Sequence, residues 1–464
     1  MQEDLNIVKD LALIFISAGF ITIIFRWLKQ PLILGYIVAG FLVGKHSGIF
    51  PYAVGEGVVE QWAELGIIFL LFSLGLEFSF KKLMQVGSTA LITAGTIFMG
   101  MFFTGMLVGD MMGWSAMERV FLGGMLSMSS TTIIIKAFDD LGLKKEPFTN
   151  VVFGALVVED LLAILLMVLL STFAVSQKFE GMEMLTNMGK LGFFLVFWFL
   201  VGIFLIPIFL KKAKKMLNEE TLLILSVGLC FGMVVLARFA GFSSALGAFV
   251  MGSILGETID GERIGKYLKG VKDLFGAIFF VSVGMMVDPA IIVEHWQPVL
   301  ILTLVVVIGI SFFATTGVLL AGKPIKVAVR SGLSMAQMGE FAFIIAGLGY
   351  SLGVMRGFIY PVVVAVAVIT TFTTPYFIKL SAPFSEWIAR NIPKKLDSVL
   401  SSYQKNNTYT DDTDQSGWRE LIKYYSLRIV LYSVMLIAII FASTSYLYPF
   451  LLEELSSFDT KLVA

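Results

Sequence analysis

The sequence predicts an all-α, polytopic membrane protein. Of its 464 residues, 57% are hydrophobic and only 15% are charged, and the mean hydropathy is +0.88, which is too apolar for a soluble globular protein. Thirteen apolar runs long enough to cross or nearly cross a bilayer are separated by short polar loops. Basic residues recur in every second loop, as the positive-inside rule requires.

The expected spans follow in order along the chain. They lie at about 8–28, 31–45, 58–78, 88–109, 117–138, 148–172, 187–210, 220–239, 242–256, 274–288, 297–321, 326–350 and 356–379. The loops after odd-numbered spans hold the lysines and arginines, which predicts an N-terminus outside and residues after 380 in the cytoplasm. Residues 381–426 are predicted to be a cytoplasmic linker, and 427–464 holds a fourteenth candidate span at 427–451. No large folded domain is predicted beyond it, as in a shortened version of a longer protein.

Glycine spacing predicts an internal repeat. LGYIVAGFLVG at 34–44 aligns with LGAFVMGSILG at 246–256, an offset of 212 residues. Ser73 to Gly75 aligns with Ser282 to Gly284 at an offset of 209, and the spans at 117–138 and 326–350 align at 207. Each match is weak alone, but all are seven spans apart, so the copies cross the membrane in opposite directions. We expect two inverted repeats, about 8–172 and 220–379, with 187–210 as a linker helix, in one membrane domain of residues 1–380.

The span at 148–172 contains an acidic pair near the bilayer midplane. Residues 151–170, VVFGALVVEDLLAILLMVLL, carry only two polar side chains, Glu159 and Asp160. One charged side chain at a helix centre costs roughly 2.5–3.5 kcal/mol on insertion scales, so such acids usually serve function. We expect an ion and proton site here. The alternative is a structural pair neutralised by a base on another helix.

Polar runs at matched positions of the two repeats predict interrupted helices that cross beside these acids. One run is SMSSTT at 127–132, and its counterpart at 334–341 is SMAQMGEF, which contains Ser334, Gln337 and Glu340. Interrupted helices expose backbone groups at the midplane of inverted-repeat transporters, and their ends carry partial charges. Two uninterrupted helices with polar packing are the alternative.

The chemistry of these groups favours transport of a hard monovalent cation. Carboxylate, hydroxyl and carbonyl oxygens suit K⁺ or Na⁺. A proton and a cation would compete for one acid, and either would neutralise it for passage through an apolar barrier, which gives cation/proton exchange. No Walker sequence is present, so ion gradients would drive transport, and no cofactor is expected. A cation channel on the same scaffold and an organic-anion symporter remain alternatives.

Other classes of function are disfavoured by composition. Cys230 is the single cysteine, which excludes disulfides and cysteine metal sites, and the two histidines form no cluster. Lys plus Arg and Asp plus Glu balance at 34 each, so no net field favours nucleic acid. An intramembrane enzyme is the least favoured class, because no Ser/His arrangement, metal-binding histidines or Asp pair on two helices is evident.

Five segments of the chain are SSTT at 129–132, VVED at 157–160, FSSALGAF at 242–249, FFVSVG at 279–284 and GEFAF at 339–343. In these segments the sequence resembles the monovalent cation:proton antiporter-2 family, in particular its Kef-type (potassium efflux-like) branch. As a set they are specific, and the likeness covers roughly residues 10–380.

The resemblance implies a homodimer in a prokaryotic inner membrane, with a mobile core domain that moves by an elevator mechanism against a dimer domain. It also implies that Asp160 is the main cation and proton carboxylate, with Glu159 before it and Ser130, Thr131 and Thr132 nearby; Asp160 and Thr131 would hold the monovalent cation. Two features depart from the family. Residues 297–320 contain no lysine that could pair with Glu159, and no GxGxxG sequence supports nucleotide or glutathione gating.

Overall fold

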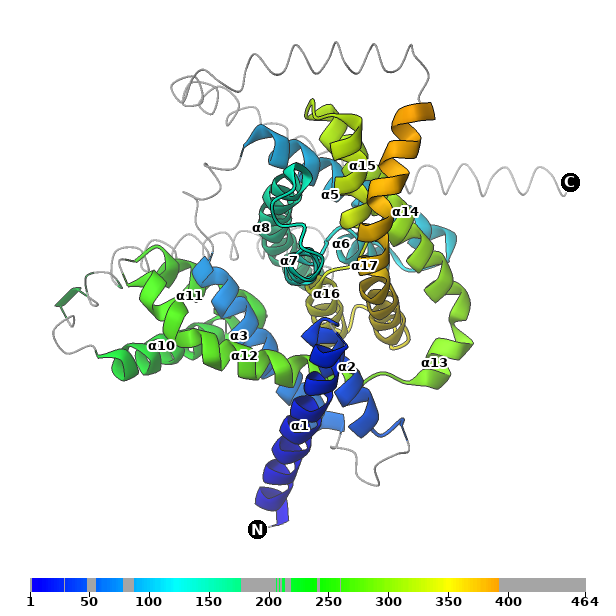
Figure 1. The fold of residues 1–464 in the computed structure, drawn as a ribbon. Coiled ribbons are helices and arrows are strands. Elements are labelled where there is room, and N and C mark those ends of the chain that lie inside the picture. The colour runs from blue at the N-terminus through cyan, green and yellow to red at the C-terminus, as the bar shows by residue number, and fades with distance from the viewer. Residues whose placement is uncertain are drawn as a thin grey trace, which may run out of the picture. The chain divides into compact units, whose positions relative to one another are not determined.

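The computed structural model of the chain describes residues 2–28, 30–47, 56–77, 87–176, 206, 208, 211–212, 218–239, 243–258 and 260–391. The regular secondary structure of these residues is helical, with no strand among them (Figure 1). The helices are α1 (Gln2–Trp27), α2 (Leu32–Val43), α3 (Glu56–Glu77), α5 (Ser88–Met111), α6 (Ala116–Leu126), α7 (Thr131–Asp140), α8 (Pro147–Ser176), α10 (Glu219–Phe239), α11 (Ser244–Gly256), α12 (Gly261–Met285), α13 (Pro289–Glu294), α14 (Trp296–Leu320), α15 (Ile325–Ser334), α16 (Glu340–Ser351) and α17 (Ile359–Asn391).

Most of the expected spans coincide with one helix or with two consecutive short helices. Within the described residues, seven helical segments are long and apolar enough to cross a membrane by length and composition. The expected spans at 187–210 and 427–451 lie almost entirely or entirely outside the described residues. Three details differ from expectation. The short helix α13 was not predicted, α12 begins at Gly261, well before the expected span at 274–288, and α17 continues to Asn391, into the segment expected to be linker.

The described helices pack in two groups. In the first, which we call the glycine-packed group, α3 packs against α11 and α12, α2 against α1 and α12, and α10 against α11. In the second, the crossing group, α5 packs against α6, α8 and α14, while α15 and α16 pack against α17. Figure 1 shows α3, α10, α11 and α12 together at the left and α8, α15 and α17 to the right. Direct contacts join the groups, such as the edge-to-face rings of Phe280 on α12 and Phe343 on α16, 5.9 Å apart.

Glycines let the backbones of the first group approach closely. A Cβ atom at Gly40 of α2 would lie 1.9 Å from the carbonyl oxygen of Val281, and one at Gly252 of α11 would lie 2.2 Å from that of Phe72. The two glycines are 212 residues apart and the two carbonyl residues 209 apart, so both members of each contact recur at the offsets of the repeat. Small residues at such crossings are typical of packed membrane helices.

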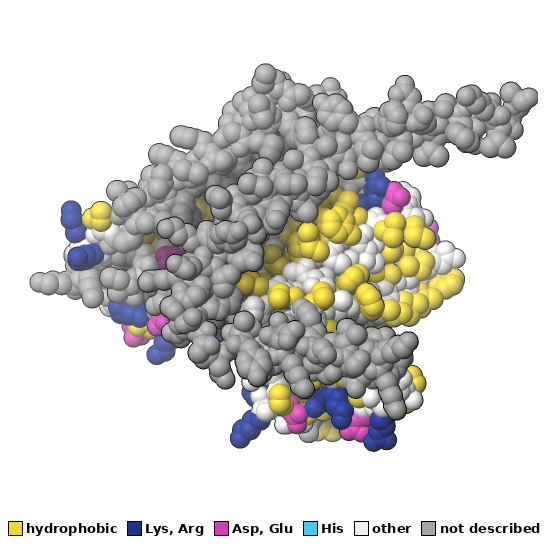
Figure 2. Space-filling model, turned by 90° about the horizontal axis from the view of Figure 1, so that it is seen from above, with side chains coloured by type: hydrophobic (Ala, Val, Ile, Leu, Met, Phe, Trp, Pro, Cys, Tyr) yellow, Lys and Arg dark blue, Asp and Glu magenta, His cyan; other side chains and the backbone are white. Residues whose placement is uncertain are grey.

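The outer surface of the crossing group is apolar. Along α14 the exposed residues Leu300, Leu304, Ile308 and Phe312 recur every fourth position and form one stripe, as on a helix that faces lipid. Figure 2 shows hydrophobic side chains over much of the described surface, with charged side chains in small groups at its edges. This distribution suits a protein whose solvent is a bilayer.

Candidate ion-binding site at the helix crossing

Both polar runs interrupt a helix. The first helix ends at Leu126 and resumes at Thr131, where Ser130 is the N-cap and its hydroxyl accepts a hydrogen bond from the Ile133 amide at 3.2 Å. The second helix ends at Ser334 and resumes at Glu340. Serine and threonine form such caps because their oxygens satisfy amides that lack a partner in the first turn. The alternative of two uninterrupted helices is therefore wrong.

The two non-helical stretches cross each other in direct contact. The Gly339 amide donates to the Met128 carbonyl at 2.8 Å, and Gln337 Nε2 donates to the Ser130 carbonyl at 3.1 Å. A Cβ atom at Gly339 would lie 2.5 Å from the Ser129 carbonyl oxygen, so only glycine allows this approach. Backbone groups freed by the interruptions thus find partners across the crossing, as they must in a low-dielectric interior.

Each acid of α8 is held by one of these stretches. Glu159 is 1% exposed, and its Oε2 accepts a hydrogen bond from the Ser129 amide at 2.9 Å. Its other oxygen, Oε1, is buried without a hydrogen-bond partner in the described protein. Asp160 is partly exposed, and its Oδ2 accepts from Thr131 Oγ1 at 3.0 Å. Asp160 is therefore the more accessible of the two acids, while Glu159 is enclosed.

A third carboxylate faces the same helix end from α16. Glu340, the first residue of α16, accepts hydrogen bonds from Ser130 Oγ and from Thr132 Oγ1, the latter at 3.1 Å. The negative charge of Glu340 lies close enough to Asp160 to repel a negative charge on that acid. No lysine or arginine of the described residues forms an ion pair with Glu159, Asp160 or Glu340. In the described part of the chain, the N-termini of α7 and α16 lie beside the acids, and their partial positive charges offset the negative charge.

Comparison with known proteins places this sequence in a family. The model of the transmembrane sodium/hydrogen exchangers matches residues 12–379. The chain belongs to this family. Within it, the chain is a Kef-type member of the cation:proton antiporter-2 group, as its motifs predicted, and its relatives are transporters and not enzymes.

Relatives of this exchanger-family chain come from bacteria, a plant and an archaeon. It is 33% identical over 76% of its length to the putative cation/proton antiporter YbaL of Escherichia coli and spans 64% of that protein. It is 28% identical over 75% of its length to the K⁺/H⁺ antiporter subunit KhtU of Bacillus subtilis, of which it spans 87%. Its fold matches that of MjNhaP1, a sodium/proton antiporter from Methanocaldococcus jannaschii, with a TM-score of 0.60 at 18% identity over 84% of this chain and 99% of that one.

In the exchanger-family chain, most of the residues predicted from the sequence lie at the crossing, but they do not all contact the same acid. Thr132 is exposed and binds Glu340, whereas Thr131 binds Asp160. Ser334 turns back to the Arg330 carbonyl of its own helix at 2.7 Å and does not contact the acids. The described residues contain no cluster of three or more His, Cys, Asp or Glu suited to a metal ion. Ligation of a monovalent cation by Asp160 and Thr131 stays a prediction.

Two contacts at the crossing were missed from the sequence. The Ser129 amide holds Glu159, and Thr370 of α17 accepts from the Met338 amide at 3.2 Å. The contact of Ser129 lies in the SSTT segment that the sequence analysis singled out, but its donor is a backbone amide, which a sequence does not reveal. The contact of Thr370 depends on how α17 packs against the crossing, which the sequence does not reveal either.

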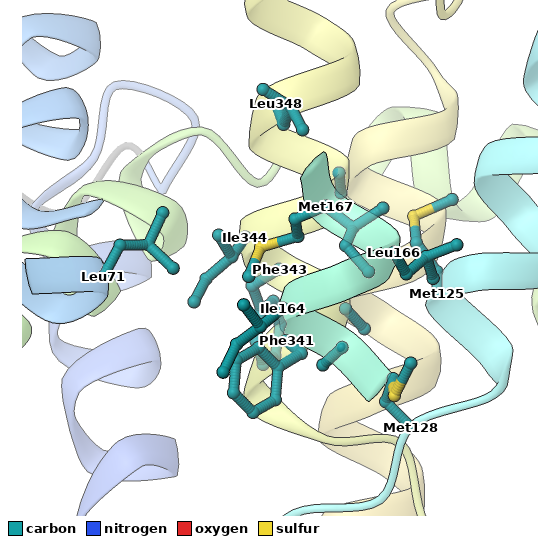
Figure 3. Packing of buried hydrophobic residues seen from close by; sticks show 14 of the residues in the cluster. Leu71, Met125, Met128, Ile164, Leu166, Met167, Phe341, Phe343, Ile344 and Leu348 are labelled. Carbon is teal, nitrogen blue, oxygen red and sulfur yellow. The ribbon is translucent and has the colours of Figure 1, made fainter. Parts of the chain in front are cut away.

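Apolar side chains enclose the crossing. Figure 3 shows Met128, Ile164 and Phe341 close to it, with Met125, Leu166 and Met167 packed farther along the helices. Leu71 of α3 faces this cluster from the glycine-packed group. Apolar side chains thus surround the acids, and an unneutralised charge is costly in such surroundings.

Proposed function

We propose that the chain exchanges a monovalent cation, K⁺ or Na⁺, for H⁺ across a membrane, with Asp160 as the carboxylate that carries either ion. The observation that carries this proposal is the setting of Asp160. It is partly exposed, it is held by Thr131 at the crossing, and no described base is paired with it. The names of YbaL and KhtU, a cation/proton and a K⁺/H⁺ antiporter, support the same exchange.

The exchange follows from electrostatics. An empty Asp160 carboxylate keeps its charge and is costly to move past apolar side chains. A bound proton or a bound cation neutralises it, so either loaded form can cross while the empty form stays. Because the two ligands occupy one group, each half-cycle carries one of them, and exchange is obligatory. Hydroxyl and carboxylate oxygens are hard ligands that suit an alkali cation.

Alternating access would occur by an elevator motion of the crossing group against the glycine-packed group. The recurrence of glycine contacts at the offsets of the two repeats supports an inverted-repeat architecture, which underlies such motion in secondary transporters. We further propose thirteen core spans, a homodimer formed through the glycine-packed group, an N-terminus outside and residues after 380 in the cytoplasm.

The test is transport by purified protein in liposomes that hold a pH gradient. Addition of K⁺ or Na⁺ should dissipate the gradient, and Asp160→Asn should abolish this response, because an amide cannot exchange a proton for a cation. Glu386→Gln serves as the matched control, since Glu386 is an exposed acid at the end of α17 that pairs only with Arg390 in the described protein. Exchange retained by Asp160→Asn would refute the assignment, and cation flux without counter-proton movement would indicate the channel alternative. A series of cations in the same assay gives the selectivity.

A further inference from the structure

The crossing is bracketed by two ion pairs that the transport site does not use. The first joins Glu118, in the first turn of α6, to Arg356 in the loop between α16 and α17. Glu118 is 3% exposed, and its Oε1 accepts from Arg356 Nε at 2.7 Å and from the Arg356 amide at 3.0 Å, while Oε2 accepts from Nη2 at 2.9 Å. Glu118 also closes a capping box with Ser115. This bidentate geometry fixes both the distance and the relative orientation of the carboxylate and the guanidinium.

Aromatic rings support the base of this pair. The Arg356 guanidinium lies 5.0 Å from the ring centroid of Phe358. Phe358 in turn stacks on His295 at 4.4 Å and meets the edge of Trp114 at 5.9 Å. Arginine is suited to such a place because its planar group binds a carboxylate and stacks on a ring at the same time.

The second ion pair has the same design with the charges exchanged. Arg330 of α15 donates from Nη1 to Glu146 Oε2 at 2.9 Å, and Glu146 lies in the turn between α7 and α8. The Arg330 guanidinium lies 4.1 Å from the ring centroid of Phe148.

The two pairs are related by the repeat. Glu146 and Phe148 precede Arg356 and Phe358 by 210 residues each. In both pairs, a residue of the first half of one interrupted helix binds the loop that follows the other interrupted helix. The first pair has its acid, Glu118, on the helix and its base in the loop, whereas the second has its base, Arg330, on the helix and its acid in the loop. We call them the Glu118 clamp and the Arg330 clamp.

We infer that Arg356 and Arg330 are positioning residues that hold the two interrupted helices in register, so that Ser129 and Thr131 stay in place for Glu159 and Asp160. This inference rests on the proposed exchange at Asp160. Few hydrogen bonds join the two interrupted stretches directly. A shift of one interrupted helix relative to the other would therefore change the distances from Ser129 to Glu159 and from Thr131 to Asp160. Displacement of a binding group by about 1 Å can cost up to roughly 100-fold in function.

The experiment measures, for each variant, the cation concentration that gives half-maximal exchange and the maximal rate, both per folded protein in liposomes. Glu118→Gln and Arg330→Gln should raise the half-saturating concentration by about 3- to 30-fold, below the limit for a full 1 Å displacement. Arg330→Lys should raise the half-saturating concentration less than Arg330→Gln does, because lysine keeps the positive charge. Exchanging the two residues, by Arg330→Glu together with Glu146→Arg, should return the half-saturating concentration most of the way to the wild-type value. Should Glu118→Gln fail to fold, the variants of the more exposed Arg330 clamp decide the question.

Asp110→Asn is the matched control. Asp110 pairs with Arg119, the neighbour of Glu118, but this pair joins α5 to α6 and does not reach the second interrupted helix. A purely structural role would lower the melting temperature or the yield and leave the half-saturating concentration unchanged. That result, or an equal rise in Asp110→Asn, would overturn the inference while wild-type exchange still stands. Absence of exchange in the wild-type protein would overturn the proposed function and this inference together.

Discussion

At the scale of single residues, two adjacent threonines serve different acids. Consecutive side chains on a helix project about 100° apart, so residues at the start of α7 point to different neighbours. Thr131 donates to Asp160 of α8, and Thr132 donates to Glu340 of α16. The first turn of α7 therefore lies between two carboxylates of different helices, and only one of its threonines contacts the proposed carrier.

Thr131→Val is expected to weaken cation binding more than Thr132→Val. A hydrogen bond to a charged group contributes about 1.5–3 kcal/mol, which corresponds to tenfold or more in affinity. The half-saturating cation concentration should therefore rise roughly tenfold or more in Thr131→Val. Thr131→Ser, which keeps the hydroxyl, should stay near wild type. Equal effects of the two valine substitutions would contradict the distinct roles of the two threonines.

At the scale of helices, much of the fold was predictable because membrane segments carry their signal in local composition. The apolar runs and the glycine spacing predicted where α1–α3, α5, α10, α11 and α14 lie. The interruptions after Leu126 and Ser334 were predicted from polar runs at matched positions. The pairing of Glu118 with Arg356 was not predictable, because it depends on how a helix start and a distant loop pack. The helix α13 was missed because its six residues, PAIIVE, are too few to show a helical period.

The close crossings of the glycine-packed group predict which glycines tolerate a methyl group. Gly284→Ala would place a Cβ atom 2.0 Å from the Ile37 carbonyl oxygen, and Gly252→Ala faces the same obstacle at Phe72. Overpacking of this kind costs about 1–3 kcal/mol, more than alanine gains over glycine as a helix former. Both variants should therefore unfold at lower temperature in detergent.

The matched control for these substitutions is Gly228→Ala on α10, where nothing lies within 4 Å of the added atom. There the gain in helix propensity, up to about 1 kcal/mol, should remain, and the unfolding temperature should be unchanged or slightly higher. A loss of stability in Gly228→Ala as large as in Gly284→Ala would refute the argument from close approach.

At the scale of the whole molecule, the charged residues that form ion pairs and the acids at the crossing lie in different places. Most described ion pairs lie at helix ends and in loops, such as Lys144 with Asp139 at 2.9 Å and Arg263 with Asp260 at 2.8 Å. The acids at the crossing have hydrogen-bond donors but no described base. Fixed charges are thus neutralised by the protein itself near helix ends, while in the proposed exchange the charge at the crossing is neutralised by the transported ion.

This division predicts how exchange depends on pH. A cation can bind Asp160 only when its carboxylate is deprotonated, so protons and cations compete for it. Where the proton is the main occupant, lowering the pH by one unit on the cation side should raise the half-saturating cation concentration by up to about tenfold. The maximal rate should recover at saturating cation, because competition alters apparent affinity and not the number of sites. Initial rates in liposomes, with the cation varied at several external pH values, measure both quantities. A half-saturating concentration that does not change with pH, or a maximal rate that does not recover, would mean that the proton and the cation bind different groups.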